Sequence, residues 1–384
     1  MTSKNFFSQQ NIALENMFQE AITAGVFPGA AMAVGFGELS SRKTVINCFG
    51  QTAFNKNKRS RVEHKTLYDL ASLTKPLATL PLVLQLLSAQ RVGFDDKLAD
   101  LLALRVPVDK ANITLADLLG HSSGLPAWLP FFRNPASRVP QESIVKSILA
   151  EPLVYQPGSR TLYSDPGYIL LGFIIERICR GELPELAAEK IYRPLAVADG
   201  LFFNCPQKKP GIYAHGEYCP WRRRLLQGEV GDENCAYLGG AAGHAGLFGN
   251  IEAVMGMVEH IHHRWQQQEQ STVAPTVFAP RELLSCLRPR AANPGSWLLG
   301  FDTPAPRGSS AGDWLSPASI GHLGFSGTSF WIDPQRQLTV VLLTNRVHPS
   351  RLNERIKRFR PIFHNTVIRE LCGAAERLQF SGPG

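Results

Sequence analysis

Apolar and polar positions alternate in ways that predict strands near both ends of the chain and helices between them. An amphipathic pattern predicts a helix over residues 7–24, followed by strands over residues 30–35 and 44–50. Near the C-terminus, two apolar and β-branched runs flank Asp333-Pro334-Gln335, which predicts a hairpin of residues 329–332 and 338–343. A last helix is expected over residues 352–371.

The middle of the chain reads as mainly helical. The helices expected there cover residues 74–90, 114–119, 141–150, 166–180 and 183–192. Strands at both ends with helices between them predict one sheet assembled from the two chain ends, with a helical insertion. We therefore expect an α/β (α+β) fold in which residues 1–67 and 236–384 form the sheet domain, residues 68–235 form a mostly helical domain, and the active site lies between them.

Composition and charge exclude several classes of protein. Hydrophobic residues make up 44% of the 384 positions and charged residues 19%, as in ordinary globular proteins. No segment reaches the ~18 consecutive apolar residues of a membrane span, and the first thirty residues lack a signal-peptide pattern, so we expect a cytoplasmic protein with no membrane partner. The net charge of +8 comes without any aromatic-interleaved basic motif, so no nucleic-acid partner is expected.

Cysteine usage indicates free thiols and no metal centre. The seven cysteines are scattered and odd in number, which favours a reducing compartment over a disulfide framework. His215 and Cys219 lie near Cys205 and Cys235, but their spacings fit no standard metal site. Neither a metal nor an organic cofactor is predicted.

A serine followed three residues later by a lysine places both side chains on one face of a helix, and this pattern occurs three times. Residues 40–43 fall between predicted strands, and residues 143–146 lie in an ordinary surface helix. Only Ser72-Leu73-Thr74-Lys75 opens a long apolar helix. There a lysine can take the serine proton, and the helix N-terminus favours the charge that develops. The competing interpretation of Ser72 is a helix cap.

A second serine lies in a formal G-x-S-x-G match, residues 120–124. That motif requires a strand before it and a helix after it. Here a predicted helix precedes it and Leu125-Pro126 follows, so Ser122 is interpreted as part of a structured loop and not as a nucleophile.

Two further segments carry candidate chemistry. Tyr163-Ser164-Asp165 precedes a predicted helix, and a tyrosine beside a lysine ammonium can shuttle protons because its phenolate is favoured there; the alternative is a packing role. Residues 321–328 are rich in small side chains at the head of the C-terminal hairpin. They would let a substrate approach the backbone N–H groups of a strand edge.

In this order and at these separations, the segments resemble the serine β-lactamase and penicillin-binding-protein superfamily. The similarity is greatest to its class C-like branch of esterases, D-stereospecific peptidases and muropeptide amidases. It covers nearly the whole chain and includes the glycine-rich segment Gly239–Phe248. The resemblance implies a β-lactamase/transpeptidase-like fold, with an antiparallel sheet flanked by helices and a mostly helical second domain.

The resemblance also implies residue roles. Ser72 would attack the carbonyl and form an acyl-enzyme, while Lys75 and Tyr163 would share the general base and general acid work. The backbone N–H groups of Ser72 and Phe325 would form the oxyanion hole. The segment His322-Leu323-Gly324 would bind substrate in place of the family's third motif, commonly Lys-Thr-Gly or His-Thr-Gly.

Three positions depart from the usual pattern. Leu323 replaces a threonine whose hydroxyl helps to hold a substrate carboxylate, which lowers the rank of β-lactamase and D-Ala-D-Ala carboxypeptidase activity. Asp165 replaces an asparagine, and its charge would keep Lys75 protonated and weaken it as a base. His322 in place of lysine leads to the hypothesis that activity changes between roughly pH 6 and 8.

Weaker candidates lie in two loops, residues 228–234 and 243–246, which resemble a subset of relatives encoded near cell-wall genes. In that subset a histidine usually occupies the position of Gly231. Glu229, Asp232 and His244 either face the substrate or hold the loops in place. The aromatic stretch of residues 128–133 either lines the cleft or packs internally.

Together these features predict a serine hydrolase that acts through an acyl-enzyme on an ester or amide bond. The expected partner is a small-molecule ester, amide or peptide, with a peptidoglycan-derived fragment as the leading candidate. The alternatives are a β-lactamase or D-Ala-D-Ala carboxypeptidase, and a non-catalytic ligand-binding or sensor protein on the same fold. A sensor would not need Ser72, Lys75 and Tyr163 together. The exact substrate, the identity of the base and the oligomeric state stay open.

Overall fold

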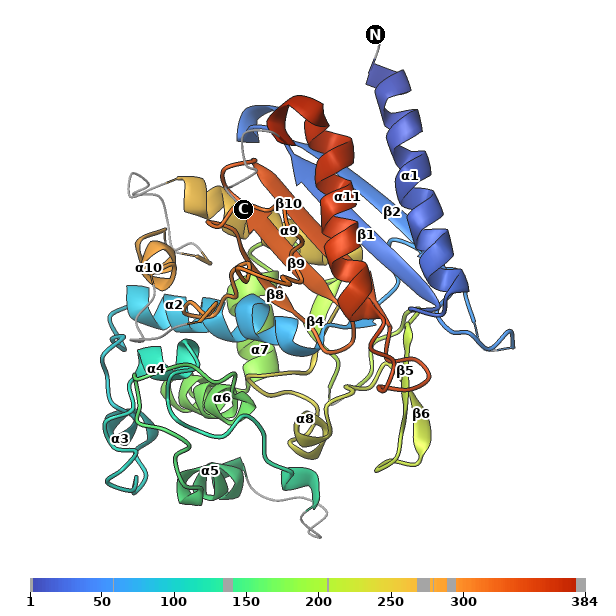
Figure 1. Cartoon of the computed structure of the whole chain (residues 1–384). Helices are drawn as coiled ribbons and strands as arrows, with labels where there is room; N and C mark the ends of the chain where they lie inside the picture. The colour runs from blue at the N-terminus through green and yellow to red at the C-terminus, as the bar shows by residue number, and fades with distance from the viewer. Residues whose placement is uncertain are drawn as a thin grey trace.

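The main sheet of the protein has five antiparallel strands drawn from both ends of the chain (Figure 1). The computed structural model describes residues 3–57, 59–133, 141–205, 207–267, 277–278, 280–288 and 295–377. From one edge to the other, the strands are β2 (Lys43–Gly50), β1 (Gly29–Phe36), β10 (Leu338–Thr344), β9 (Ser329–Asp333) and β8 (Ile320–Leu323). The predicted antiparallel sheet assembled from both chain ends is thus confirmed.

The two faces of this sheet are covered by different helices because alternate strand residues point to opposite sides. Ala30 and Met32 of β1 pack with helices α1 (Ser3–Thr23) and α11 (Ile356–Arg377), which lie side by side on one face. Ala31 and Ala33 belong to the core on the other face, where α9 (Ile251–Gln266) contacts β1 and β10. Phe18 of α1 stacks on Phe49 of β2 with ring centroids 4.1 Å apart, which fixes α1 to the sheet.

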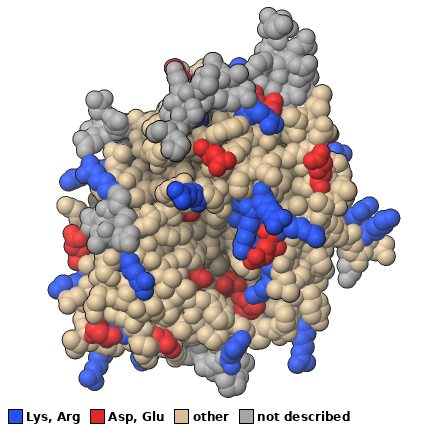
Figure 2. Space-filling view, viewed as in Figure 1, with Lys and Arg blue, Asp and Glu red and all other residues tan. Residues whose placement is uncertain are grey.

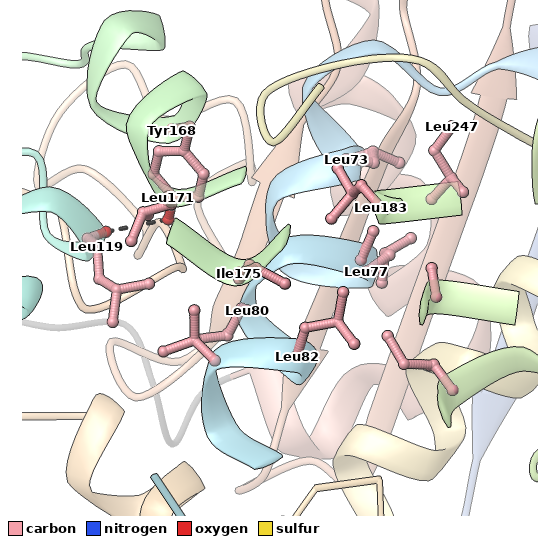
Figure 3. Packing of buried hydrophobic residues seen from close by; sticks show 14 of the residues in the cluster. Leu73, Leu77, Leu80, Leu82, Leu119, Tyr168, Leu171, Ile175, Leu183 and Leu247 are labelled. Carbon is pink, nitrogen blue, oxygen red and sulfur yellow. Dashed lines mark hydrogen bonds between the residues drawn. The ribbon is translucent and has the colours of Figure 1, made fainter. Parts of the chain in front are cut away.

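The helical part of the molecule packs around α2 (Leu80–Ser88), whose first seven residues are almost entirely apolar. Side chains of α2 meet those of α6 (Asp165–Cys179), and the Tyr168 hydroxyl of α6 donates to the Leu119 carbonyl at 3.1 Å (Figure 3). One cluster of buried apolar residues runs from the sheet into these helices. The division at residues 67/68 and 235/236 therefore remains a prediction, since a single core spans it.

Short strands interrupt the segment that the sequence predicted to be mainly helical. β3 (Tyr68–Asp69), β7 (Leu247–Gly249) and β4 (Leu201–Phe203) form a small antiparallel sheet, while β5 (His215–Cys219) and β6 (Arg224–Gln227) form a hairpin. These strands are only two to five residues long, too short to produce a clear alternating pattern. The remaining α-helices are α3 (Leu98–Leu102), α4 (Leu115–Leu119), α5 (Gln141–Ala150), α7 (Leu183–Ala187), α8 (Glu233–Tyr237) and α10 (Pro280–Cys286).

Two expectations about the chain as a whole can be compared with the described residues. Six cysteines lie in the described part of the chain and all six are free thiols, while the Cys372 side chain lies outside it. In the same part of the chain, every helix falls short of the length and apolar character needed to cross a membrane.

The loop before β7 presses directly against helix α6, and Gly243 makes this contact possible. A Cβ atom at position 243 would lie 2.0 Å from the Tyr168 carbonyl oxygen and 2.9 Å from the Gly172 nitrogen. The Gly243 carbonyl also accepts a hydrogen bond from the Thr79 hydroxyl at 2.6 Å, so the loop cannot move away without losing it.

We expect Gly243→Ala to lower the free energy of unfolding by about 2–3 kcal/mol, because the new methyl group overpacks a backbone contact. Urea unfolding followed by circular dichroism measures the change. Gly256→Ala is the matched control: Gly256 is exposed on α9, where a Cβ atom would lie 3.3 Å from one Val197 methyl group and clear of backbone. The gain in helix propensity of up to ~1 kcal/mol should offset this slight crowding, so its midpoint should stay near the wild-type value. Equal midpoints for Gly243→Ala and the wild type would contradict the packing argument.

Candidate active site

Ser72 lies at the junction between strand β3 and the first helical turns before α2. The Asp69 side chain ends the strand by accepting the Ala71 N–H at 2.9 Å, and Ala71 adopts a left-handed backbone with φ of +48°. A 3₁₀ turn over Ala71–Leu73 then leads into a π-type turn over Lys75–Thr79, which continues as α2. The sequence predicted one regular helix here; the observed turns are the kind often found at functional sites.

The Lys75 ammonium connects Ser72 to two other parts of the chain. Its side chain is fully buried, and Nζ donates to the Ser72 hydroxyl at 3.2 Å, to Asp165 Oδ1 at 2.7 Å and to the His244 carbonyl at 3.2 Å. Nζ also lies 4.7 Å from the centre of the Tyr163 ring. The structure thus brings together the serine, lysine and tyrosine that the sequence singled out, together with Asp165.

Charge around this group favours the protonated forms. Burial by itself lowers the pKa of Lys75, but the neighbouring Asp165 carboxylate and the Tyr163 phenol outweigh it and raise the pKa above its usual value. Burial raises the pKa of Tyr163, although Lys75 and the Ser72 hydroxyl counteract part of this increase. At neutral pH the site therefore holds an ammonium at Lys75 and a neutral phenol at Tyr163. This agrees with the prediction that Asp165 keeps Lys75 protonated.

The turn between β8 and β9 lies against the backbone just before Ser72, because its Ser326 and Thr328 hydroxyls donate to the Asp69 and Leu70 carbonyls. Strand β8 is the edge of the main sheet, and Phe325 follows it in the turn, with its ring 55% exposed. A Cβ atom at Gly324 would lie 2.0 Å from Thr328 Oγ1 and 2.7 Å from the Leu70 carbonyl oxygen. Glycine therefore lets this turn approach the backbone just before Ser72, as the small residues of the segment predicted.

His322 does not carry the charge that the sequence suggested. Its ring is buried, and its Nδ1 lies 3.0 Å from the Leu323 carbonyl oxygen. Burial and the nearby Lys75 ammonium lower the pKa of His322 to about 3. The sequence did not reveal this complete burial beside a cation, which argues against a His322 charge that titrates near neutrality; the activity change between pH 6 and 8 stays a prediction.

Two ring-bearing residues that the sequence did not single out, His121 and Trp297, pack against Tyr163. His121 has a φ of +56° and accepts the Ser164 N–H at Nδ1, 3.1 Å away, which sets its ring 4.5 Å from Tyr163. Trp297 lies 5.0 Å from Tyr163 and 5.6 Å from His322, measured between ring centroids. His121 belongs to the loop that the sequence identified, but Trp297 lies in a segment without a recognisable motif.

The three weaker candidates, Glu229, Asp232 and His244, line the cleft and also make contacts within its loops. Asp232 caps α8 by accepting the Cys235 N–H, and its Oδ1 lies 3.0 Å from His244 Nε2. Burial raises the pKa of Asp232, but the interactions with His244 and with the Cys235 N–H outweigh it and lower the pKa to about 2. Glu229 is paired with the exposed Arg224. The two interpretations of these residues are therefore compatible, since all of them line the cleft and two of them hold its loops.

A group of possible metal ligands differs from the one considered in the sequence. Glu217, Cys219 and Glu233 place one ligand atom each within 4.8 Å of one another. The Arg351 guanidinium bridges the two carboxylates, so it occupies the position in which a cation would compensate their charge. This ion-pair cluster joins β5, α8 and the segment before α11.

A cleft of about 620 Å³ contains these features. Ser72, Tyr163 and Asp165, the 322–325 segment and the three weaker candidates line it, while Lys75 lies beneath its surface. Trp128 is 46% exposed and also lines the cleft, whereas residues 131–133 do not. Figure 2 shows the hollow near the centre of the face, with acidic side chains along its lower side and a group of Lys and Arg side chains beside it.

Comparison with known proteins places the chain in a family. The family model described as Beta-lactamase matches residues 14–360. A putative D-alanyl-D-alanine carboxypeptidase of Escherichia coli K12 is 33% identical over 74% of this chain and 70% of its own length. An N-acetylmuramyl-L-alanine amidase of Bacillus subtilis 168 is 29% identical over 87% of this chain and 80% of its own length.

Solved structures support the same fold. The unliganded selenomethionyl simvastatin synthase LovD of Aspergillus terreus superposes with a TM-score of 0.71 at 20% identity, covering 95% of this chain and 99% of its own. The β-lactamase/transpeptidase-like fold and the resemblance seen in the sequence are confirmed. The chain belongs to the Beta-lactamase family and is a serine hydrolase.

Proposed function

We propose that Ser72 forms an acyl-enzyme with the carbonyl carbon of an amide or ester in a peptidoglycan-derived fragment. The observation that carries this proposal is the contact of the Ser72 hydroxyl with the buried Lys75 ammonium, 3.2 Å apart, beside Tyr163 at the wall of the cleft. The names of the two relatives denote cleavage of amide bonds to alanine, which supports a peptide or muropeptide substrate.

The steps of the reaction follow from the positions of these groups. Ser72 Oγ attacks the carbonyl carbon, and its proton passes to the coupled pair of Lys75 and Tyr163 after that pair has lost one proton. The backbone N–H groups of Ser72 and Phe325 stabilise the negative charge on the carbonyl oxygen. The pair then returns a proton to the leaving amine or alcohol, and water releases the acyl group by the reverse sequence.

Leu323 and its neighbours favour amide or ester substrates that lack a carboxylate near the scissile bond over D-Ala-D-Ala peptides and β-lactams. Both alternatives use substrates with a carboxylate near the scissile bond. Leu323 offers no hydroxyl, and the nearby hydroxyls of Ser326 and Thr328 already donate to the Asp69 and Leu70 carbonyls at 2.7 and 3.1 Å. No side chain of this turn is therefore free to replace the missing threonine. The observation in favour of D-Ala-D-Ala carboxypeptidase activity is the name of the E. coli relative.

A labelling experiment tests the proposal. We expect a fluorophosphonate probe to modify wild-type protein at Ser72, with fluorescent penicillin giving no stable adduct and Ser72→Ala giving none with either probe. Intact-mass measurement followed by peptide mapping identifies the site. Labelling by penicillin as well would favour the lactam or carboxypeptidase alternative, and failure of both probes would favour the non-catalytic sensor.

The protonation states of Lys75 and Tyr163 predict that the labelling rate rises on the alkaline limb of its pH profile. Because Lys75 and Tyr163 both have raised pKa values, the pair holds both protons at pH 7, and only its singly deprotonated form accepts the Ser72 proton. The rate of fluorophosphonate labelling should therefore rise with pH from 7 to 10. Asp165→Asn removes the charge that stabilises the ammonium, so the limb should move to lower pH by about 1–2 units and the rate at pH 7 should increase. An unchanged limb in Asp165→Asn would contradict this assignment.

A second variant tests the correction to His322. Since this imidazole is neutral above about pH 4, with a pKa of about 3, His322→Gln should leave the shape of the rate profile between pH 6 and 8 unchanged. An inflection near pH 6 that both proteins share would belong to Asp69 or Asp302, whose burial raises each pKa to about 6. If the wild type showed an inflection between pH 6 and 8 that was absent from His322→Gln, the result would show that His322 titrates in this range.

A further inference from the structure

Arg360 of helix α11 reaches from the back of the main sheet to the turn that carries Phe325. The residue is only 6% exposed. Its Nη2 group donates to the Gly324 carbonyl at 2.9 Å and to the Thr328 carbonyl at 2.7 Å, at the two ends of the turn. One planar group therefore fixes the distance across the turn.

Two other carbonyl groups of the turn also have donors. Arg346 donates its Nε–H to the Phe325 carbonyl at 2.8 Å and its backbone N–H to the Ser326 carbonyl at 3.0 Å. The Gly324 N–H donates to the Thr328 carbonyl at 2.7 Å. With these carbonyls occupied, no acceptor among the described residues takes the Phe325 N–H. It stays available to a carbonyl oxygen in the cleft.

The same turn is tied to the backbone in front of the nucleophile. The Ser326 hydroxyl donates to the Asp69 carbonyl at 2.7 Å, and the Thr328 hydroxyl donates to the Leu70 carbonyl at 3.1 Å. The two proposed oxyanion donors, the N–H groups of Ser72 and Phe325, are therefore held at a set separation by contacts that include neither catalytic side chain.

The charge of Arg360 is not explained by an ion pair. Within the described part of the chain no carboxylate pairs with it, and its Nε is buried without a partner. Burial and the neighbouring Arg346 lower its pKa to about 9, so the guanidinium remains charged at pH 7. Burying an unpaired cation is costly, and an apolar side chain would fill this space at lower cost if packing were the only requirement.

We propose that Arg360 is a positioning residue that holds the 324–328 turn so that the Phe325 N–H points at the substrate carbonyl oxygen. This inference rests on the proposed function, because it assumes that Ser72 is acylated. Arg360 acts through the turn and does not itself bind the substrate. Its effect on the rate should therefore be the same for substrates with and without a carboxylate.

The test compares rates of labelling by an uncharged fluorophosphonate in Arg360→Met, Arg360→Lys and a matched control, Arg264→Met. Arg264 is also 6% exposed, lies on a helix and donates to a backbone carbonyl, that of Phe278 at 3.1 Å. Arg360→Met should slow labelling by about 10- to 100-fold, the range for a displaced oxyanion donor. Arg360→Lys should recover part of the rate, and the control should retain it even if its melting temperature falls by a similar amount.

Several outcomes would overturn the inference while leaving the proposed function intact. These are a wild-type rate in Arg360→Met, an equal loss in the Arg264→Met control, and a loss confined to carboxylate-bearing substrates in steady-state assays. If Arg360→Met does not fold, Ser326→Ala replaces it: it removes the tie to the Asp69 carbonyl, and a wild-type labelling rate would count against the inference. Absence of labelling in the wild type itself would instead refute the proposed function.

Discussion

The buried ammonium of Lys75 is the interaction on which the arrangement of this site depends. An unpaired cation in the interior is strongly unfavourable, so the chain must bring acceptors to it from several directions. The acceptors come from the turn that carries Ser72, from the N-terminus of α6 through Asp165, and from the loop before β7 through the His244 carbonyl. Asp165 and His244 are 90 and 169 residues from Lys75 in the sequence, but all three segments meet at one atom, and the close packing of Gly243 on α6 keeps them together.

The same constraint decides the state in which the enzyme rests. Asp165 makes the buried ammonium stable, and a stable ammonium is a poor base. Tyr163 and Lys75 are close enough to share their protons, so in the proposed mechanism the proton that leaves before acylation belongs to the pair and not to either residue alone. Stability of the fold and readiness for catalysis therefore oppose each other at Asp165.

Much of the site was predictable because its chemistry lies in short contiguous motifs. Ser72 and Lys75 are one helical turn apart, and Tyr163 and Asp165 precede a strongly apolar helix, so spacing and periodicity were sufficient to identify them. The apolar and β-branched runs of β1, β9 and β10 similarly predicted the sheet. Trp297 and Arg360 were not predictable, because each is brought to the cleft only by tertiary packing. The neutral state of His322 was missed for a related reason: residue type suggests a pKa, but burial beside Lys75 determines it.

The electrostatics of the cleft bear on its substrate. A relative with lysine in the third motif and asparagine at position 165 would place two positive charges beside the nucleophile. Here the Lys75 charge is offset by Asp165, and His322 is neutral. Arg351 is bound to Glu217 and Glu233, and Arg346 and Arg360 donate to backbone carbonyls of the turn or of its neighbours. A carboxylate close to the scissile bond would therefore find the Arg346 and Arg360 side chains already donating to backbone carbonyls, and Leu323 offers it no hydroxyl. The same substitutions leave Ser72 and the 324–328 turn in place, which is the combination that the proposed amidase or esterase activity requires.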